Sequence, residues 1–311
     1  MRPISSVARR LTLTVCLLAG FGCETTTPPA GPVSRVVITD SPFPYQWIER
    51  VDVYVVSVSV SVSPDTSSAG NFVTIATPNR RVNLFALTKG LTEELGSAPL
   101  PTGAITAVRM VIDTDSSSMT TVNGFEITGK TGSPSIQWQS SAGRPVLNAL
   151  IHEQITVPDT GALIVIDFDI GKAFLLNRFV NPGSPDSGFV FSPVIRAADA
   201  RRTGSIRGTV RAQTANGTLL ENVNVRLYLG DPNQPENTWS ELGTAGTDAS
   251  GDFVLSFVTP SAHWATVPAQ AGKTYHVVAA PYPGSIYGQR VIQNVTVTAG
   301  QETNLGAVIL P

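Results

Sequence analysis

The 311-residue chain is poor in the side chains on which thiol and metal chemistry depends. Its two cysteines are Cys16 and Cys23, so everything after position 23 is free of cysteine. That absence excludes disulfides, a thiolate zinc site and a cysteine nucleophile from the bulk of the chain. The three histidines, His152, His263 and His276, lie far apart and form no His-x-x-x-His pair. They therefore do not predict a zinc protease site.

Several reaction and partner classes lack their sequence signals as well. The chain has no Gly-x-Ser-x-Gly elbow, no Walker loop and no dinucleotide fingerprint, so we predict neither a catalytic site nor a cofactor. Lysine and arginine total 21 against 23 acidic residues. Without the leader arginines Arg2, Arg9 and Arg10, the balance is 18 against 23, or about −5 with neutral histidines. Because nucleic-acid binding requires a basic surface, nucleic acid is not a predicted partner.

The N-terminus predicts export and lipid attachment. A basic leader precedes the apolar residues 11–22, which are too few for a permanent membrane helix but suit a signal peptide over residues 1–22. Cys23 follows the small residue Gly22, as lipid attachment before signal cleavage requires. Gly20 stands where the usual motif prefers leucine, and the competing interpretation is an ordinary signal peptide that contains a cysteine. Glu24, not aspartate, follows Cys23, which favours the outer membrane over the inner one.

What remains is a composition typical of β-structure: valine, threonine, serine and glycine are abundant, and charge is sparse. About 290 residues after Cys23 suffice for two domains. We predict a Thr/Pro-rich tether over residues 23–33, a β-rich domain over 34–202 and a second β-domain over 203–311. The predicted fold class is all-β, with two β-sandwiches in tandem.

In the first domain, the valines change parity within one run. Val51, Val53 and Val55 share one face, and Val56 starts a run of valines on the other, which predicts either a bulge or the meeting of two strand segments at this point. Leucines at helical spacing predict a short, broken helix over residues 83–95, although Gly90 lies inside it. Residues 113–118 are predicted as a loop after a strand over 105–112. A turn at residues 158–161 predicts a hairpin between 155–157 and 162–170.

The second domain shows evenly spaced short strands, predicted at 205–212, 223–229, 253–257, 275–279, 291–297 and 305–310. Its most specific segment runs from Thr247 to Phe253. There Gly251 is suited to a positive-φ turn, Asp248 can cap the turn, and Phe253 begins the next strand in the core.

These segments carry two resemblances. Residues 204–210, 220–227 and 247–253 make the second domain similar to the carboxypeptidase regulatory-like, transthyretin-type sandwich. This resemblance implies a folding or spacer module, sometimes with a carbohydrate-binding-like fold, and no peptidase activity. The first domain resembles a family of unknown function found in bacterial lipoproteins, through residues 38–42, 100–103, 166–169 and 192–196.

Two sets of residues are candidate binding sites. Asp167 and Asp169 share one strand face, and Asp113 and Asp115 lie in a Ser-rich segment, so convergence of the four would offer the oxygen ligands that calcium prefers. We favour the alternative, in which the first pair lies on a solvated face and the second caps its loop. Loop aromatics offer stacking surfaces for sugar rings, or else close the ends of the second sandwich. These aromatics are Trp239, Trp264, Tyr282 and Tyr287.

Taken together, these observations predict a lipid-anchored protein of the bacterial cell envelope with a non-catalytic binding or scaffolding role. Its expected partners are the membrane, through the lipid on Cys23, and a polysaccharide or an envelope protein. A carbohydrate-binding accessory lipoprotein is the alternative. A glycan hydrolase is a remote one, because carboxylates on one strand give no acid/base separation across a cleft.

Overall fold

The computed structural model describes residues 31–41, 47–129, 134–138, 143–176, 188–281 and 284–311. In these ranges the fold is mostly β, with no helix of seven or more residues, as the composition predicts. Gly31–Pro311 forms one compact unit. Two hydrophobic cores lie within it, one built from residues between Val36 and Ala197 and the other from residues between Ile206 and Leu310. The several sheets are consistent with tandem β-sandwiches.

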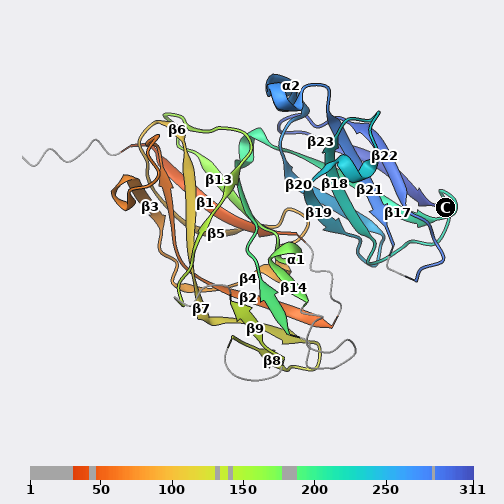
Figure 1. The fold of residues 1–311 in the computed structure, drawn as a ribbon, viewed down its shortest axis with the longest axis horizontal. Helices are drawn as coiled ribbons and strands as arrows, with labels where there is room; N and C mark the ends of the chain where they lie inside the picture. Colours follow the sequence, from red (N-terminus) through yellow and green to blue (C-terminus); the bar gives the residue numbers. More distant parts are fainter. Residues whose placement is uncertain (1–30, 42–46, 130–133, 139–142, 177–187, 282–283) are drawn as a thin grey trace, which may run out of the picture. The chain divides into compact units, whose positions relative to one another are not determined.

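Two large sheets enclose the first core (Figure 1). One has the order β11-β16-β13-β1-β5, and its strands are β11 (Leu150–Ile151), β16 (Ile195–Asp199), β13 (Leu163–Phe168), β1 (Val33–Asp40) and β5 (Glu93–Pro99). The other has the order β10-β7-β2-β3, with β4 on β2 and β8 on β7. Its strands are β10 (Val146–Asn148), β7 (Ala107–Thr121), β2 (Ile48–Ser61), β3 (Phe72–Ala76), β4 (Arg80–Asn83) and β8 (Glu126–Ile127).

Smaller elements complete the first part of the fold. β12 (Ile155–Val157) pairs with β6 (Gly103–Ile105), and β15 (Phe189–Phe191) joins β14 (Phe174–Leu176) to β9 (Ile136–Trp138). The helical pieces are α1 (Ile170–Ala173) and three 3₁₀ turns, η1 (Ala69–Asn71), η2 (Leu84–Ala86) and η4 (Ala200–Arg202). Since β12 pairs with β6 while β13 pairs with β1 and β16, the hairpin predicted between 155–157 and 162–170 is wrong. Its turn does form, with Gly161 N donating to Pro158 O.

The second core lies between a sheet of order β20-β17-β23 and one of order β19-β18-β21-β22. Their strands are β17 (Gly204–Ala212), β18 (Asn224–Gly230), β19 (Ser240–Gly246), β20 (Asp252–Val258), β21 (Thr274–Ala280), β22 (Arg290–Val295) and β23 (Glu302–Leu310). The helical pieces are α2 (Ser261–Thr266), η5 (Glu236–Thr238) and η6 (Pro268–Gln270). All six predicted strands form, and β19 was not predicted.

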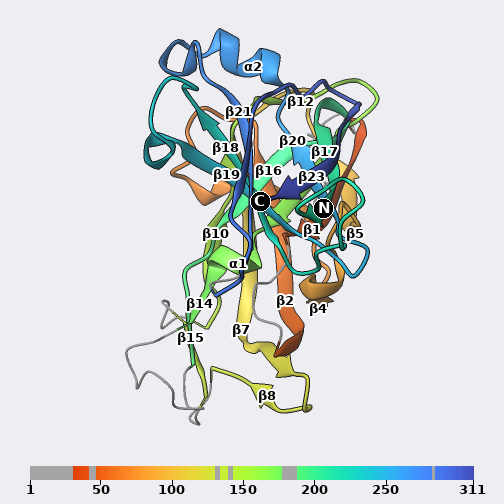
Figure 2. The ribbon, with the colours of Figure 1, turned by 90° about the vertical axis from the view of Figure 1, so that its right-hand side faces the viewer.

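The predicted bulge is confirmed in the pairing of β2 with β7, which run side by side in Figure 2. Val55 pairs with Ile112 and Ser57 with Val111, so Val56 is the extra residue. Val55 and Val58 are both fully buried, because the bulge moves the buried side chains from one parity to the other. The valine pattern therefore places one continuous apolar face on a strand of fourteen residues.

Two other predictions for the first domain need correction. The segment 83–95 is the 3₁₀ turn η2 followed by the start of β5, because Lys89 and Gly90 both take positive φ and break any helix. Residues 113–118 lie within β7 and not in a separate loop. They do leave the ladder locally, since Tyr54 pairs with Asp113 and Asp52 with Ser118. Residues 114–117 thus face the single residue Val53.

The turn at the start of β20 forms as predicted. Gly251 has φ +70°, and Asp248 Oδ1 accepts hydrogen bonds from Ser250 N at 2.8 Å and Asp252 N at 3.0 Å. Phe253 is completely buried in the second core. Each residue in this segment therefore has the local role that its chemistry indicated.

Candidate functional site

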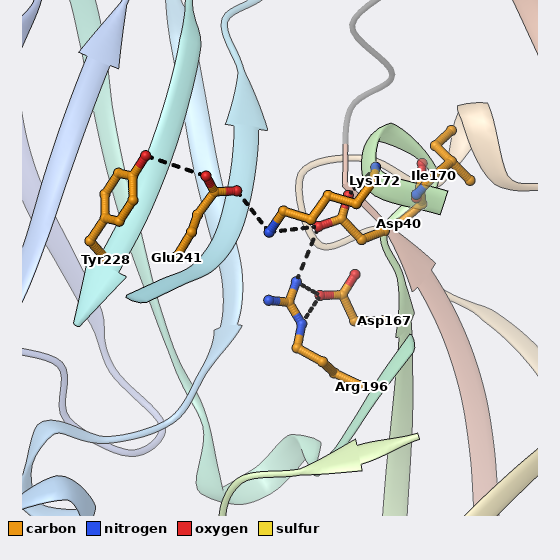
Figure 3. A network of polar contacts seen from close by, with 8 residues as sticks. Asp40, Asp167, Ile170, Lys172, Arg196, Tyr228 and Glu241 are labelled. Atoms are coloured by element: carbon orange, nitrogen blue, oxygen red, sulfur yellow. Dashed lines mark hydrogen bonds and ion pairs between the residues drawn. The ribbon is translucent and has the colours of Figure 1, made fainter. Parts of the chain in front are cut away.

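A cluster of charged side chains gathers where β1, β13 and β16 lie side by side (Figure 3). Asp40 ends β1, Asp167 lies in β13, and Arg196 lies in β16. The register pairs Asp167 with Arg196 on one side and with Thr39 on the other. Strand pairing between segments far apart in the sequence therefore brings these groups together.

Arg196 and Asp167 form the best-defined ion pair of the cluster. Arg196 donates to Asp167 Oδ2 from Nη2 at 2.6 Å and from Nε at 3.2 Å, and both side chains are largely covered. Arg196 Nη2 also lies 3.9 Å from Asp169 Oδ2. Burial opposes the charged guanidinium, but the carboxylates of Asp167 and Asp169 outweigh it and raise the pKa of Arg196.

The cluster continues through α1 to the second core. Asp169 is fully buried and caps α1, accepting from Lys172 N at 3.1 Å. Lys172 Nζ lies 3.4 Å from Asp169 Oδ2 and 2.7 Å from Glu241 Oε1 on β19, toward which it points in Figure 3. Glu241 Oε2 in turn accepts from Tyr228 at 3.3 Å. We call this set, with Asp40, Asp167 and Arg196, the charge network.

Asp40 differs from Asp169, whose Oδ2 also lacks a hydrogen bond but lies near Lys172 and Arg196, because Asp40 has no ion-pair partner among the described residues. Its Oδ1 accepts from Ile170 N at 3.0 Å, whereas Oδ2 is buried and has no hydrogen-bond partner among the described residues. Burial raises the pKa of Asp40 well above its ordinary value, and the nearby charges of Asp167 and Asp169 raise it further. The carboxyl group of Asp40 therefore keeps its proton to a higher pH than an ordinary aspartate does.

A cleft of about 770 Å³, part of it open to solvent, adjoins the network. Residues of both cores line it, including Asp40, Arg196, His152, Thr244 and Tyr275. At its margins Lys89 pairs with Asp248, and the ring of His152 meets that of Trp264 edge-on at 5.6 Å. Partial burial lowers the pKa of His152, aided by the charges of Arg196 and His263.

The structure does not bring the four predicted calcium ligands together. Asp113 accepts from Arg144 Nε at 3.0 Å and from Ser116 N at 3.0 Å, so it caps its segment as the favoured alternative predicted. Asp115 is exposed on β7. Asp167 and Asp169 belong to the charge network and not to a solvated face, which corrects that part of the prediction. No group of three or more His, Cys, Asp or Glu side chains suited to a metal occurs in the described ranges.

Two of the four predicted aromatic side chains, Trp239 and Trp264, are also not presented to solvent. Trp239 is 8% exposed, and its ring stacks on His276 at 3.9 Å. Trp264 is 6% exposed and donates its indole N–H to the Tyr275 hydroxyl. Tyr287 packs against the second core, while Tyr282 lies outside the described residues. The two indoles therefore close the second sandwich, as the alternative interpretation held.

Sequence reasoning missed Asp40, Lys172, Arg196 and Glu241 as parts of a site. Asp40 and Arg196 occurred in the segments that carried the family resemblance, but no local spacing links them. Lys172 follows Asp169 by three residues, which brings two side chains together on a helix but not on a strand. The sequence alone did not show that the strand ends at Phe168 and that a helix follows. Glu241 lies on the unpredicted strand β19.

Cys23 lies outside the described residues, and no helix within the described ranges is long and apolar enough to span a membrane.

This fold and charge network occur in a chain whose residues 32–189, just over half of its length, match a family described as a domain of unknown function, DUF4382. The chain belongs to this family. No curated protein matches it.

Among solved structures, the chain is similar to shaft pilin SpaA from Lactobacillus rhamnosus GG, with 10% identity over 90% of this chain and 97% of the pilin, at a TM-score of 0.23. A streptococcal ancillary pilin shows 10% identity over 89% of this chain and 62% of its own, at a TM-score of 0.22. A 9R-lipoxygenase from Cyanothece PCC8801 shows 17% identity over 36% of this chain, at a TM-score of 0.23. The chain covers only 17% of the lipoxygenase.

Proposed function

We propose that this protein is a lipid-anchored component of the bacterial cell envelope with a non-catalytic binding or scaffolding role. In the mature protein, an acyl-modified Cys23 holds the chain at a membrane, and the tether over residues 23–33 sets its reach. One anchored terminus and a short tether would keep both cores close to the bilayer surface. The outer membrane is the proposed location.

The observation that carries the scaffolding role is the contact of Lys172 with Glu241, at 2.7 Å between side chains that belong to different cores. The acidic and basic groups of the network form ion pairs with one another and so stabilise the fold. A scaffold needs such a rigid connection between its modules, whereas a hydrolase would direct at least one acid and one base toward a substrate. The geometry therefore supports a scaffold that presents a binding surface better than it supports a hydrolase.

The second sandwich is proposed to be a carboxypeptidase regulatory-like module that supports the first. The support is the segment from Asp248 to Phe253, whose capped turn and buried aromatic match the resemblance in its most specific part. The carbohydrate-binding alternative stays a prediction, and the burial of Trp239 and Trp264 gives it no support. Retention on a polysaccharide affinity gel that is lost in Trp239→Ala would revive it.

Anchoring is tested by replacing Cys23 with serine. We expect Cys23→Ser to abolish acyl labelling and to release the protein into the soluble envelope fraction. Cys16→Ser is the matched control, because that cysteine lies in the predicted signal core and should leave both readouts unchanged. Membrane retention of unacylated Cys23→Ser would contradict the proposal.

The rigid connection is tested by Glu241→Lys, which places a second cation opposite Lys172. We expect faster tryptic cleavage near Arg201 and Arg202, in the segment that leads into β17. Glu302→Lys is the control, because its partner Arg207 belongs to the same sandwich. Equal cleavage rates in wild type and Glu241→Lys would argue against a scaffold held by this contact.

A further inference from the structure

We infer that the cleft beside the charge network binds a small organic molecule that carries a primary ammonium group. This inference goes beyond the proposed function, which names no small-molecule ligand. It rests on unsatisfied acceptors in the cleft wall, on an imbalance of charge, and on the mixed character of the lining.

The first argument is an unsatisfied carboxyl oxygen. Asp40 lines the cleft and is only 6% exposed. Its Oδ2 atom has no hydrogen-bond partner among the described residues. Thr244, on β19, also lines the cleft and has a buried Oγ1 without a hydrogen-bond partner among the described residues. Buried polar atoms normally have a hydrogen-bond partner, and one left without it costs about 1–3 kcal/mol. Two such atoms in one cleft indicate a ligand that donates hydrogen bonds.

The second argument is the charge balance. Five carboxyl groups belong to the network or the cleft margin, namely Asp40, Asp167, Asp169, Glu241 and Asp248. Three cationic side chains face them, namely Lys89, Lys172 and Arg196. Each of these three is already paired with a carboxylate other than Asp40. When Asp40 is ionised, these three side chains therefore leave it without a cation, and an ammonium group would supply a positive charge with three N–H donors and no acceptor.

The third argument concerns the rest of the ligand. Leu242, Val258 and Tyr275 line the same cleft and give it an apolar part beside its polar groups. The described residues offer no group of three or more metal-ligating side chains. An apolar or hydroxyl-bearing body attached to the ammonium group fits this lining better than a bare cation does.

A proton occupies the place of the cation when the cleft is empty. Burial keeps Asp40 protonated to a pH well above its ordinary range, and an ammonium group would favour its ionised form. Binding should therefore release a proton and strengthen as the pH rises. The other titratable or charged groups around the cleft are Asp167 on β13, Asp169 and Lys172 at α1, Arg196 on β16, Glu241 on β19, Tyr275 on β21, Lys89, Asp248 and His152. His152 stays neutral at pH 7 because its pKa is lowered, so it adds no opposing charge there.

The experiment is calorimetric titration of the full-length protein, held in non-ionic detergent, with cyclohexylamine. Cyclohexanol is the matched neutral probe, because it has the same ring with a hydroxyl in place of the ammonium group. We expect saturable binding of the amine at pH 7 and binding at least tenfold weaker for the alcohol. Titration in buffers of different ionisation enthalpy should show release of a proton from the protein.

Variants locate the site. Asp40→Asn keeps an oxygen that accepts from Ile170 N but removes the charge, and should weaken amine binding at least tenfold and abolish proton release. Thr244→Val should weaken binding by a smaller factor, which keeps the test decisive if Asp40→Asn fails to fold. Asp159→Asn, at an exposed turn, should bind as wild type does. Equal affinity for both probes, or amine binding unchanged in Asp40→Asn or Thr244→Val, would overturn the inference and leave the Cys23 experiment unaffected.

Discussion

The two cores treat buried polar groups in different ways. The first holds the buried carboxyl groups Asp40 and Asp169 together with the Asp167–Arg196 pair, and the second holds the large aromatic rings of Trp239, Trp264 and Tyr275, each hydrogen-bonded within the same sandwich. Trp239 donates to Asp231 O at 3.0 Å, and Tyr275 donates to Thr259 O at 2.6 Å. A buried charge is costly unless an opposite charge or a hydrogen-bond donor lies beside it, whereas a buried indole or phenol needs only one hydrogen bond for its polar atom. The first core is therefore the one equipped to respond to a neighbour or a ligand.

The largest effect is expected from Arg196→Ala in the first core. Its removal leaves Asp167 without its ion-pair partner and Asp169 without one of its two cations, in surroundings that exclude most water. We expect the free energy of unfolding to fall by about 3–5 kcal/mol, measured by urea denaturation. Arg207→Ala, from the exposed pair with Glu302, should change stability far less. Equal losses in the two variants would remove the contrast between buried and exposed pairs.

The corresponding change in the second core is Trp239→Ala. It leaves a cavity beside His276 and removes the hydrogen bond to Asp231 O, so we expect a loss of about 3 kcal/mol. Gly230 lies so close to this ring that a Cβ added at this position would come within 2.0 Å of Trp239 Cδ1. We therefore expect Gly230→Ala to destabilise the same sandwich. A Trp239→Ala protein as stable as wild type would show that the ring adds nothing to the core.

The two cores should also differ in their dependence on pH, through Asp40. Its pKa is raised in the folded protein, so above an ordinary value of 3.8 the unfolded chain releases a proton that the folded chain retains. Asp40 therefore lowers stability as the pH rises from about 4 toward its folded pKa, by up to about 1.4 kcal/mol per pH unit. Asp40→Asn should gain stability relative to wild type as the pH is raised from 4 to 7. A difference that stays constant over this range would contradict the prediction.

The smallest effect is expected where the two cores meet. Glu241→Gln removes the charge facing Lys172 but keeps an acceptor for Tyr228, and Lys172 retains Asp169. We expect a loss of about 0.5–1 kcal/mol at low salt that diminishes at 1 M salt. Glu302→Gln serves as the control in an exposed pair within the second sandwich. A loss unaffected by salt would mean that packing, and not charge, holds this contact.

The elements that sequence reasoning predicted correctly are those set by local rules. The parity change at Val56 specified the bulge, and the spacing of turn residues specified six strands of the second sandwich. Leucine spacing misled at residues 83–95, because Lys89 and Gly90 leave the helical region while Leu91 is 61% exposed. Strand β19 escaped prediction because Ser240, Glu241, Gly243 and Thr244 interrupt any apolar alternation.

The charge network could not be predicted for a different reason. Asp167 and Arg196 meet because β13 pairs with β16, and Asp40 joins them because β1 pairs with β13 on the other side. Asp167 and Arg196 are 29 residues apart, and β1 and β13 are separated by more than a hundred, so neither pairing leaves a periodic signal in the sequence. Asp167 and Asp169 were correctly singled out, but their alternation suggested solvent on a face that the fold covers.

The position of β1 has a mechanical consequence. The described fold begins just before this strand, which lies between β13, parallel to it, and β5, antiparallel to it. A pull on the chain from its N-terminal side therefore loads two ladders of hydrogen bonds along their length at the same time. Such shear must break many bonds together, whereas a strand at the edge of a sheet can be peeled away one pair at a time. The first strand of the described fold is thus placed to bear tension applied from its N-terminal side.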